Sequence, residues 1–218
     1  MIESYPDPGA MADAAAQAIA ADLAIAIASR GVASLVATGG RAPGPIYDRL
    51  GAADLNWTRI TVTLSDDRCV GVDHPDSNAR LVRTRLLQGL AASATFLPLW
   101  PTPDPAKLRA LTPFDVVMLG MGEDGHVASL IPGDPGLEDG LATSDLTRDV
   151  PAGLGRPPLA RITLSLSALS DARAIFLLIA GTAKREVITR ALAGQDLPVG
   201  RLIVQAGVRL RILWTPGD

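Results

Sequence analysis

The stretch FDVVMLGMGEDGHVASLIPG, residues 114–133, decides the fold. Its first part, Asp115 to Leu119, is apolar from Val116 onward, and a short apolar run is typical of a buried strand. Glycines and charged residues, from Gly120 to His126, follow at once. In open α/β sheets, ligands bind beyond the carboxyl ends of the strands. This stretch therefore predicts a parallel strand that leads directly into a binding or catalytic loop.

The same pattern recurs on both sides of this stretch. Further strands are predicted at 33–37, 59–64, 162–166, 174–179 and 210–214. Helices are predicted at 9–30, from about 45, at 78–90 and at 182–192. Strands that alternate with helices indicate parallel βαβ crossovers. We expect an α/β fold with a mostly parallel central sheet flanked by helices.

Length and composition favour one domain over residues 1–218. The chain has 218 residues, of which 48% are hydrophobic and 20% charged, and single domains commonly reach this length. The net charge is -3, and the sequence contains no run of basic residues that could neutralise a nucleic-acid backbone. Nucleic acid is therefore not an expected partner.

The N-terminal sequence indicates where in the cell the protein is expected, and the numbers of cysteines and histidines indicate whether a disulfide or a metal site is expected. The start MIESYPDPG is acidic and contains two prolines, so it does not resemble a secretion signal. Apolar runs such as Ala174 to Ala180 fall short of the roughly 20 residues that cross a membrane. Cys69 is the only cysteine, and His74 and His126 are the only histidines. We expect a cytoplasmic protein with no membrane contact, disulfide, metal or cofactor.

The segment Gly120 to Gly125 matches the dinucleotide-binding pattern GxGxxG, but its context does not fit. That pattern needs a helix directly after the glycines, whereas Pro132 and Gly133 interrupt the following residues almost at once. A different use fits better, because accessible backbone N–H groups would lie beside Glu123, Asp124 and His126. We interpret His126 as the central candidate for proton transfer.

Other polar residues follow predicted strands or begin later elements. A loop from Ser65 to Ser77 begins with Asp66, Asp67 and Arg68, where carboxylates and a guanidinium could orient a carbonyl or phosphate. Arg161 and Lys184 could add cationic contacts or be surface charges. The segments 132–140 and 151–158 are interpreted as loops around the site. No GxSxG nucleophile motif occurs, which favours direct attack by water.

Four segments together resemble the 6-phosphogluconolactonase family. They are SDDRCVGVDHPDSN at 65–78, residues 114–133, RITLSLSAL at 161–169 and GTAK at 181–184. The resemblance extends from about residue 35 to residue 214. The run GMGEDGHVASLIPG is its most specific part, since the related glucosamine-6-phosphate deaminases and isomerases share the glycine-histidine core and then continue differently.

The resemblance implies a modified Rossmann-like fold and a metal-free hydrolase. The implied reaction is hydrolysis of 6-phospho-D-glucono-1,5-lactone to 6-phospho-D-gluconate in the oxidative pentose phosphate pathway. His126 matches the histidine that acts as base toward water, and Glu123 or Asp124 could orient its ring. Asp66 and Asp67 match an acidic pair, with Asp67 where glutamate is usual. The positions matched to substrate or phosphate binding are Gly39, Gly40, Arg68, Arg161 and Lys184.

The first glycine loop departs from the family. A pair of small hydroxyl residues usually follows the two glycines, whereas here Arg41 and Ala42 follow them. Arg41 could replace the missing donors with a charge-assisted contact to phosphate, or it could point to solvent.

Two other functions stay open on the same fold. One is a sugar-phosphate isomerase or deaminase, and the other is a sugar-phosphate sensor without catalysis. The expected assembly is a monomer or a small homo-oligomer, with a small-molecule sugar-phosphate lactone as partner.

Overall fold

The central sheet of the computed structural model, which describes residues 2–217, has the strand order β1-β10-β9-β6-β2-β3-β5. All six neighbouring pairs are parallel. The strands are β1 (Ile2–Ser4), β2 (Ala33–Ala37), β3 (Ile60–Leu64), β5 (Thr95–Phe96), β6 (Phe114–Gly120), β9 (Ala172–Ala180) and β10 (Leu210–Thr215). The predicted α/β fold with a parallel central sheet is confirmed.

Strand β6 lies at the centre of this sheet, between β9 and β2. Its residues Phe114 to Leu119 are all buried, and Val116 pairs with Leu35 on one side and Ala174 on the other. A strand covered on both faces is mostly apolar, and residues 114–119 are apolar except Asp115, which is buried and accepts a hydrogen bond from the Ser34 N–H at 2.8 Å.

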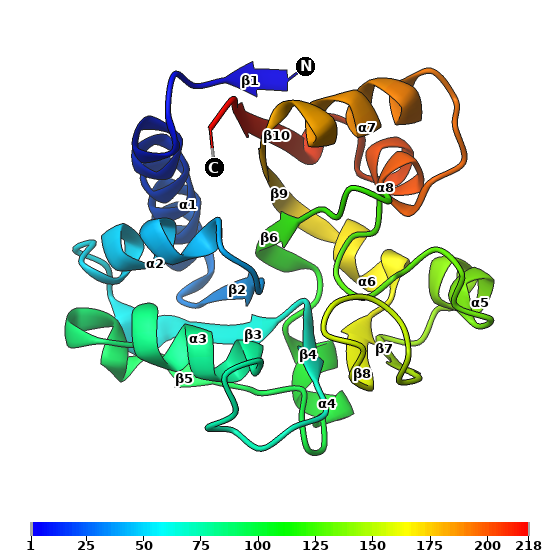
Figure 1. Ribbon diagram of the computed structural model, residues 1–218. Helices are drawn as coiled ribbons and strands as arrows, with labels where there is room; N and C mark the ends of the chain where they lie inside the picture. Colours follow the sequence, from blue (N-terminus) through cyan, green and yellow to red (C-terminus); the bar gives the residue numbers. More distant parts are fainter. Residues whose placement is uncertain (1, 218) are drawn as a thin grey trace.

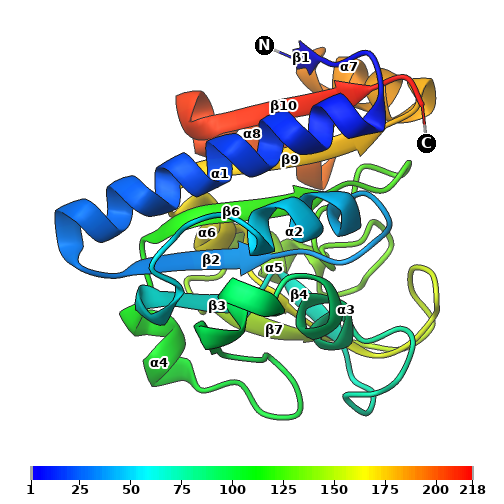
Figure 2. The same cartoon turned by 90° about the vertical axis from the view of Figure 1, so that its left-hand side faces the viewer.

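Helices cover both faces of the sheet (Figures 1 and 2). In Figure 2, α1 and α2 lie in front of the sheet, and α6 lies behind it. The helices are α1 (Pro8–Arg30), α2 (Pro43–Gly51), α3 (Asn78–Arg85), α4 (Pro105–Ala110), α5 (Leu137–Ala142), α6 (Leu166–Ser170), α7 (Thr182–Leu192) and α8 (Pro198–Ala206). Short 3₁₀ helices lie at Trp57–Arg59, Gly89–Ser93 and Gly207–Arg209. The helix predicted at 78–90 ends earlier, at Arg85, and the second 3₁₀ helix begins at Gly89, near the end of that range.

Helix α1 is the longest helix of the described chain. The Asp7 carboxylate accepts a hydrogen bond from the Ala10 N–H at 2.8 Å, and Gly31 ends the helix with a φ of 78°. With 23 residues, α1 is by length and composition alone long and apolar enough to cross a membrane, whereas the strongly apolar runs considered in the sequence are shorter. A core helix passes the same test, and Met11, Ile19 and Leu23 of α1 are buried in the core.

A second, three-stranded sheet was not foreseen. It has the order β4-β8-β7 and consists of β4 (Asp66–Arg68), β7 (Thr147–Val150) and β8 (Arg161–Leu164), all paired antiparallel. Residues 66–68 were predicted as part of a loop, and the strand predicted at 162–166 lies in this sheet rather than in the central one. The pairing joins segments far apart in the sequence, such as Asp67 with Ile162. The residues of β4 themselves therefore show no sequence pattern that would predict a strand.

Candidate active site

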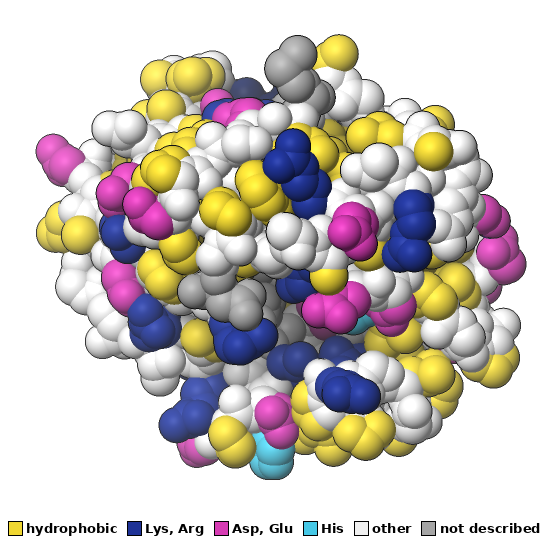
Figure 3. All heavy atoms as spheres, turned by 45° about the horizontal axis from the view of Figure 1, so that its top comes forward, with side chains coloured by type: hydrophobic (Ala, Val, Ile, Leu, Met, Phe, Trp, Pro, Cys, Tyr) yellow, Lys and Arg dark blue, Asp and Glu magenta, His cyan; other side chains and the backbone are white. Residues whose placement is uncertain are grey.

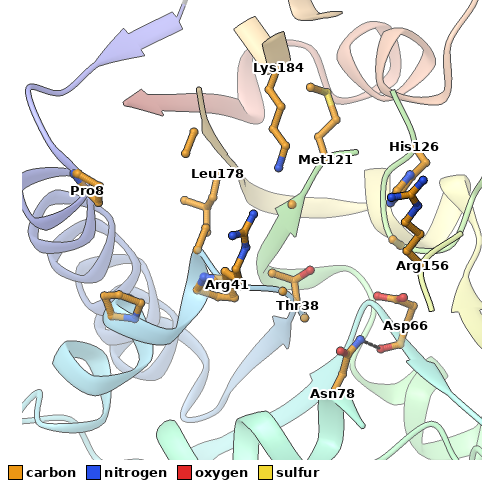
Figure 4. A pocket seen from close by; sticks show the side chains of 18 of the residues that line it. Pro8, Thr38, Arg41, Asp66, Asn78, Met121, His126, Arg156, Leu178 and Lys184 are labelled. Carbon is orange, nitrogen blue, oxygen red and sulfur yellow. Dashed lines mark hydrogen bonds between the residues drawn. The ribbon is translucent and has the colours of Figure 1, made fainter. Parts of the chain in front are cut away.

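A cavity of about 380 Å³ opens at the carboxyl ends of four central strands. Gly120, Ala180 and Thr215, the last residues of β6, β9 and β10, line it, and so does Thr38, the residue after β2. Figure 4 shows the side chains that face this cavity, and Figure 3 shows Lys and Arg side chains around a hollow in this face of the molecule. The site therefore lies where parallel sheets commonly bind ligands.

The loop after β6 carries His126 into the cavity. Gly122 donates its N–H to the His126 carbonyl at 3.0 Å, and Gly125 donates to the Gly122 carbonyl at 3.1 Å. A Cβ atom at Gly122 would overlap the His126 ring and the Asp124 carboxylate. In the described chain, the next helix begins only at Leu137, so the glycines do not open a helix as a dinucleotide site requires.

The Asp124 carboxylate orients the His126 ring. Its Oδ1 lies 2.6 Å from His126 Nδ1, and the same oxygen accepts the His126 backbone N–H at 3.2 Å. Burial alone would raise the pKa of Asp124, but the hydrogen bond and charge of His126 outweigh it and lower that pKa. A proton held on Nδ1 by this contact leaves Nε2 as the basic nitrogen. Asp124 and Glu123, the other candidate, are both exposed and neither lines the cavity; Asp124 is the one that contacts the His126 ring.

Asp66 and Asp67 have different surroundings although they are adjacent. Asp66 lines the cavity and accepts hydrogen bonds from Ser65 Oγ at 2.8 Å and Ser129 Oγ at 2.6 Å. Asp67 does not line the cavity and instead accepts the N–H groups of Asn78 and Ala79, at 2.7 and 3.1 Å, at the start of α3. Burial raises the pKa of Asp67 despite these bonds. Successive residues of a strand point to opposite faces, which separates the predicted pair.

Arg68 and Arg161 line the cavity and are held by the protein itself. Arg68 Nη1 donates to Asn78 Oδ1 at 2.6 Å and to the Asp76 carbonyl at 3.0 Å. Arg161, only 4% exposed, donates from Nη2 to the Pro157 carbonyl at 2.8 Å, and its Nη1 lies 4.0 Å from Asp66 Oδ2. Burial, followed by the charge of Arg68, lowers the pKa of Arg161.

Three further cations line the cavity. They are Arg41, Arg156 and Lys184, and none of them forms a hydrogen bond or ion pair with any of residues 2–217. In Figure 4, Arg41 and Lys184 point toward one another across the cavity, and Arg156 lies on the same side as His126. Charges without partners in a cavity are available to an anionic ligand.

The first glycine loop forms another wall. A Cβ atom at Gly39 would overlap the Asn78 side chain, and Gly40 has a φ of 99°, so glycine suits both positions. Asn78 also donates from Nδ2 to the Asp66 carbonyl at 2.8 Å, as Figure 4 indicates. Gly39, Gly40 and Arg41 therefore border the cavity together with the start of α3.

Sequence reasoning missed part of the lining. The residues not foreseen include Thr38, Asn78, Met121, Arg156, Leu178 and Thr215. Arg156 had an indirect signal, because residues 151–158 were predicted to form a loop around the site. The complete lining has five cationic side chains against the single carboxylate of Asp66, so the cavity favours an anionic ligand such as a phosphate ester.

Comparisons with known proteins agree with this geometry. Residues 6–214 match the family described as glucosamine-6-phosphate isomerases/6-phosphogluconolactonase. A Caulobacter vibrioides protein named 6-phosphogluconolactonase is 39% identical, over 98% of this chain and 96% of that protein. The crystal structure of a 6-phosphogluconolactonase from Shewanella baltica matches with a TM-score of 0.88 at 35% identity, over 99% of this chain and 97% of that one. A monomeric glucosamine-6-phosphate deaminase, at 18% identity and a TM-score of 0.79, shares the fold.

Proposed function

The chain belongs to the glucosamine-6-phosphate isomerase/6-phosphogluconolactonase family, and we propose that it hydrolyses 6-phospho-D-glucono-1,5-lactone to 6-phospho-D-gluconate. This reaction belongs to the oxidative pentose phosphate pathway. The observation that carries the proposal is His126, which lines a cavity with five cations and whose Nδ1 lies 2.6 Å from the Asp124 carboxylate. We assign the activity to one domain that spans residues 1–218.

His126 acts as the general base. Neutral Nε2 removes a proton from water while the water oxygen attacks the lactone carbonyl carbon, and the carbonyl electron pair moves onto its oxygen. The tetrahedral intermediate then collapses, the bond from that carbon to the ring oxygen breaks, and the ring oxygen takes the proton from the imidazolium. Asp124 holds the ring in the required tautomer and stabilises its charged form, as a carboxylate does in other base-orienting pairs.

The phosphate is bound at the other side of the cavity from His126. Arg41 and Lys184 point toward one another there and have no partner among residues 2–217, so they can contact the phosphate oxygens directly. The Gly39 and Gly40 backbone borders the same region. Arg68 and Arg161 add positive charge to the cavity wall, although some N–H groups of each guanidinium already donate to protein oxygens. Phosphate contacts at one end orient the lactone carbonyl toward His126.

The test is the rate of acid release from freshly prepared 6-phosphoglucono-1,5-lactone, with and without the protein. Unphosphorylated glucono-1,5-lactone and a chelator serve as controls. We expect a strong, chelator-resistant acceleration for the phosphorylated lactone alone. Equal rates with and without folded protein would refute the proposal. Ammonia release from glucosamine 6-phosphate would instead indicate a deaminase, and tight binding of 6-phosphogluconate without turnover would indicate a sensor.

A further inference from the structure

Arg156 is a charged cavity residue with no part in the mechanism above. It lies in the segment 151–160, which contains neither helix nor strand, and its side chain is exposed. It lines the cavity, lies on the side of His126 in Figure 4 and has no partner among residues 2–217. An arginine in this position can contact the reacting end of a bound lactone.

Hydrogen bonds within the segment and from Arg161 hold the backbone around Arg156 in place. Gly153 donates its N–H to the Pro158 carbonyl at 3.1 Å, which closes the segment on itself. Arg161 Nη2 donates to the Pro157 carbonyl at 2.8 Å, directly after Arg156. A Cβ atom at Gly155 would lie 3.0 Å from Arg161 Nη2 and 3.1 Å from Ile131 Cδ1. The segment therefore rests on a buried arginine and on Ile131.

The same buried arginine contacts the loop that carries His126. Arg161 Nη1 donates to Ser129 Oγ at 3.5 Å, and that hydroxyl donates to Asp66 at 2.6 Å. Ser129 and Ile131 follow His126 in the loop after β6. One buried cluster of Asp66, Ser129 and Arg161 thus contacts both the His126 loop and the Arg156 segment.

We infer that Arg156 is a second catalytic residue, which stabilises the oxyanion formed when water attacks the lactone, and that Arg161 is its positioning residue. The inference rests on the proposed function. The carbonyl oxygen gains a negative charge in the tetrahedral intermediate, and a fixed cation is most effective where charge develops during the reaction. Arg156 contacts the oxygen through its guanidinium N–H groups and transfers no proton.

The first test compares kcat and KM of Arg156→Gln with those of the wild type. Gln removes the charge but keeps a polar side chain, and Arg190→Gln, on the exposed face of α7, is the matched control. Because an oxyanion contact acts in the transition state, we expect kcat to fall about 10- to 100-fold with KM unchanged. Arg156→Lys should recover part of kcat.

Each result has a distinct meaning. An unchanged kcat in Arg156→Gln would overturn the inference and leave the proposed function intact. A raised KM with an unchanged kcat would also overturn it, by making Arg156 a phosphate ligand. Absence of turnover by the folded wild-type protein would overturn the proposed function, and the inference with it.

The positioning role of Arg161 is tested without removing this buried charge. Gly155→Ala places a methyl group against Arg161, whereas Gly153→Ala adds one in open space at a similarly positive φ. We expect only Gly155→Ala to lower kcat in the wild-type background, and to lower it much less when Arg156 is already Gln. If Gly155→Ala lowered kcat equally in the wild type and in Arg156→Gln, its effect would not depend on Arg156, and the positioning role of Arg161 would be refuted.

Discussion

The floor and the rim of the cavity use the same residue types in different ways. The floor consists of Asp66, Arg68 and Arg161, and each of them is already bonded to the protein, to Ser129, Asn78 and the Pro157 carbonyl respectively. The rim consists of Arg41, His126, Arg156 and Lys184, and among residues 2–217 only His126 of these four has a side-chain partner, Asp124. An arginine that lines the cavity is therefore not by itself a phosphate ligand, because N–H groups already bonded to the protein are not available to a substrate.

The largest effect on turnover is expected at the rim, from His126→Gln. Loss of the general base should lower kcat by about 10² to 10⁴-fold, while the phosphate contacts and KM persist. The unfolding midpoint in urea should fall only slightly, because the partly exposed Asp124–His126 contact contributes less than about 1 kcal/mol. His74→Gln, at an exposed histidine outside the cavity, is the control. A folded His126→Gln enzyme with normal kcat would remove His126 from the mechanism.

The largest effect on stability is expected at the floor, from Asp66→Ala. The substitution removes the acceptor of Ser129 and the carboxylate nearest to Arg161, which leaves a buried charge less compensated. Removal of one partner from a buried charge cluster typically costs about 3 to 5 kcal/mol. Urea denaturation measures this loss, and Arg41→Ala at the rim is the comparison. Equal stability of the two variants would abolish the distinction between floor and rim.

A smaller effect is expected from single phosphate ligands at the rim. Lys184→Ala and Arg41→Ala should each raise KM about 10- to 100-fold, the value of one charged hydrogen bond of ~1.5 to 3 kcal/mol. Arg41→Ser introduces a hydroxyl of the kind usual in the family, so its KM should lie below that of Arg41→Ala. A KM for Arg41→Ala equal to that of the wild type would place Arg41 outside the phosphate site.

The smallest effect concerns the stability contributed by Asp124. Its pKa is lowered in the folded protein, so its contribution is present above the ordinary pKa of about 3.9 and is lost as the pH falls through the folded value. Because the side chain is about half exposed, we expect Asp124→Asn to cost less than about 1 kcal/mol at pH 7. Urea denaturation at pH 7 and at pH 3 measures this difference, which should shrink at pH 3. If the wild type and Asp124→Asn differed more in free energy of unfolding at pH 3 than at pH 7, ionised Asp124 would not be the stabilising form.

Local patterns predicted the central elements well. Residues 33–37 form β2 and residues 182–192 form α7 with the predicted bounds, because each combines a clear apolar pattern with definite ends. The antiparallel sheet was missed since β4 has only three residues, two of them acidic, and its partner lies far along the chain. Had Asp66 and Asp67 been recognised as strand residues, alternation would have placed them on opposite faces.

The sequence by itself determined the α/β class, the loop that presents His126 and the family. These features depend on short motifs and apolar runs, which are contiguous in the sequence and can be recognised without knowing the tertiary contacts. Only the tertiary structure decided which charges reach the cavity. Asp67 caps α3, Arg161 supports a neighbouring segment, and Arg156 enters from a loop with no pattern of its own. The physical reason is that a side chain's role depends on the partners it meets in space, and those partners come from distant parts of the chain.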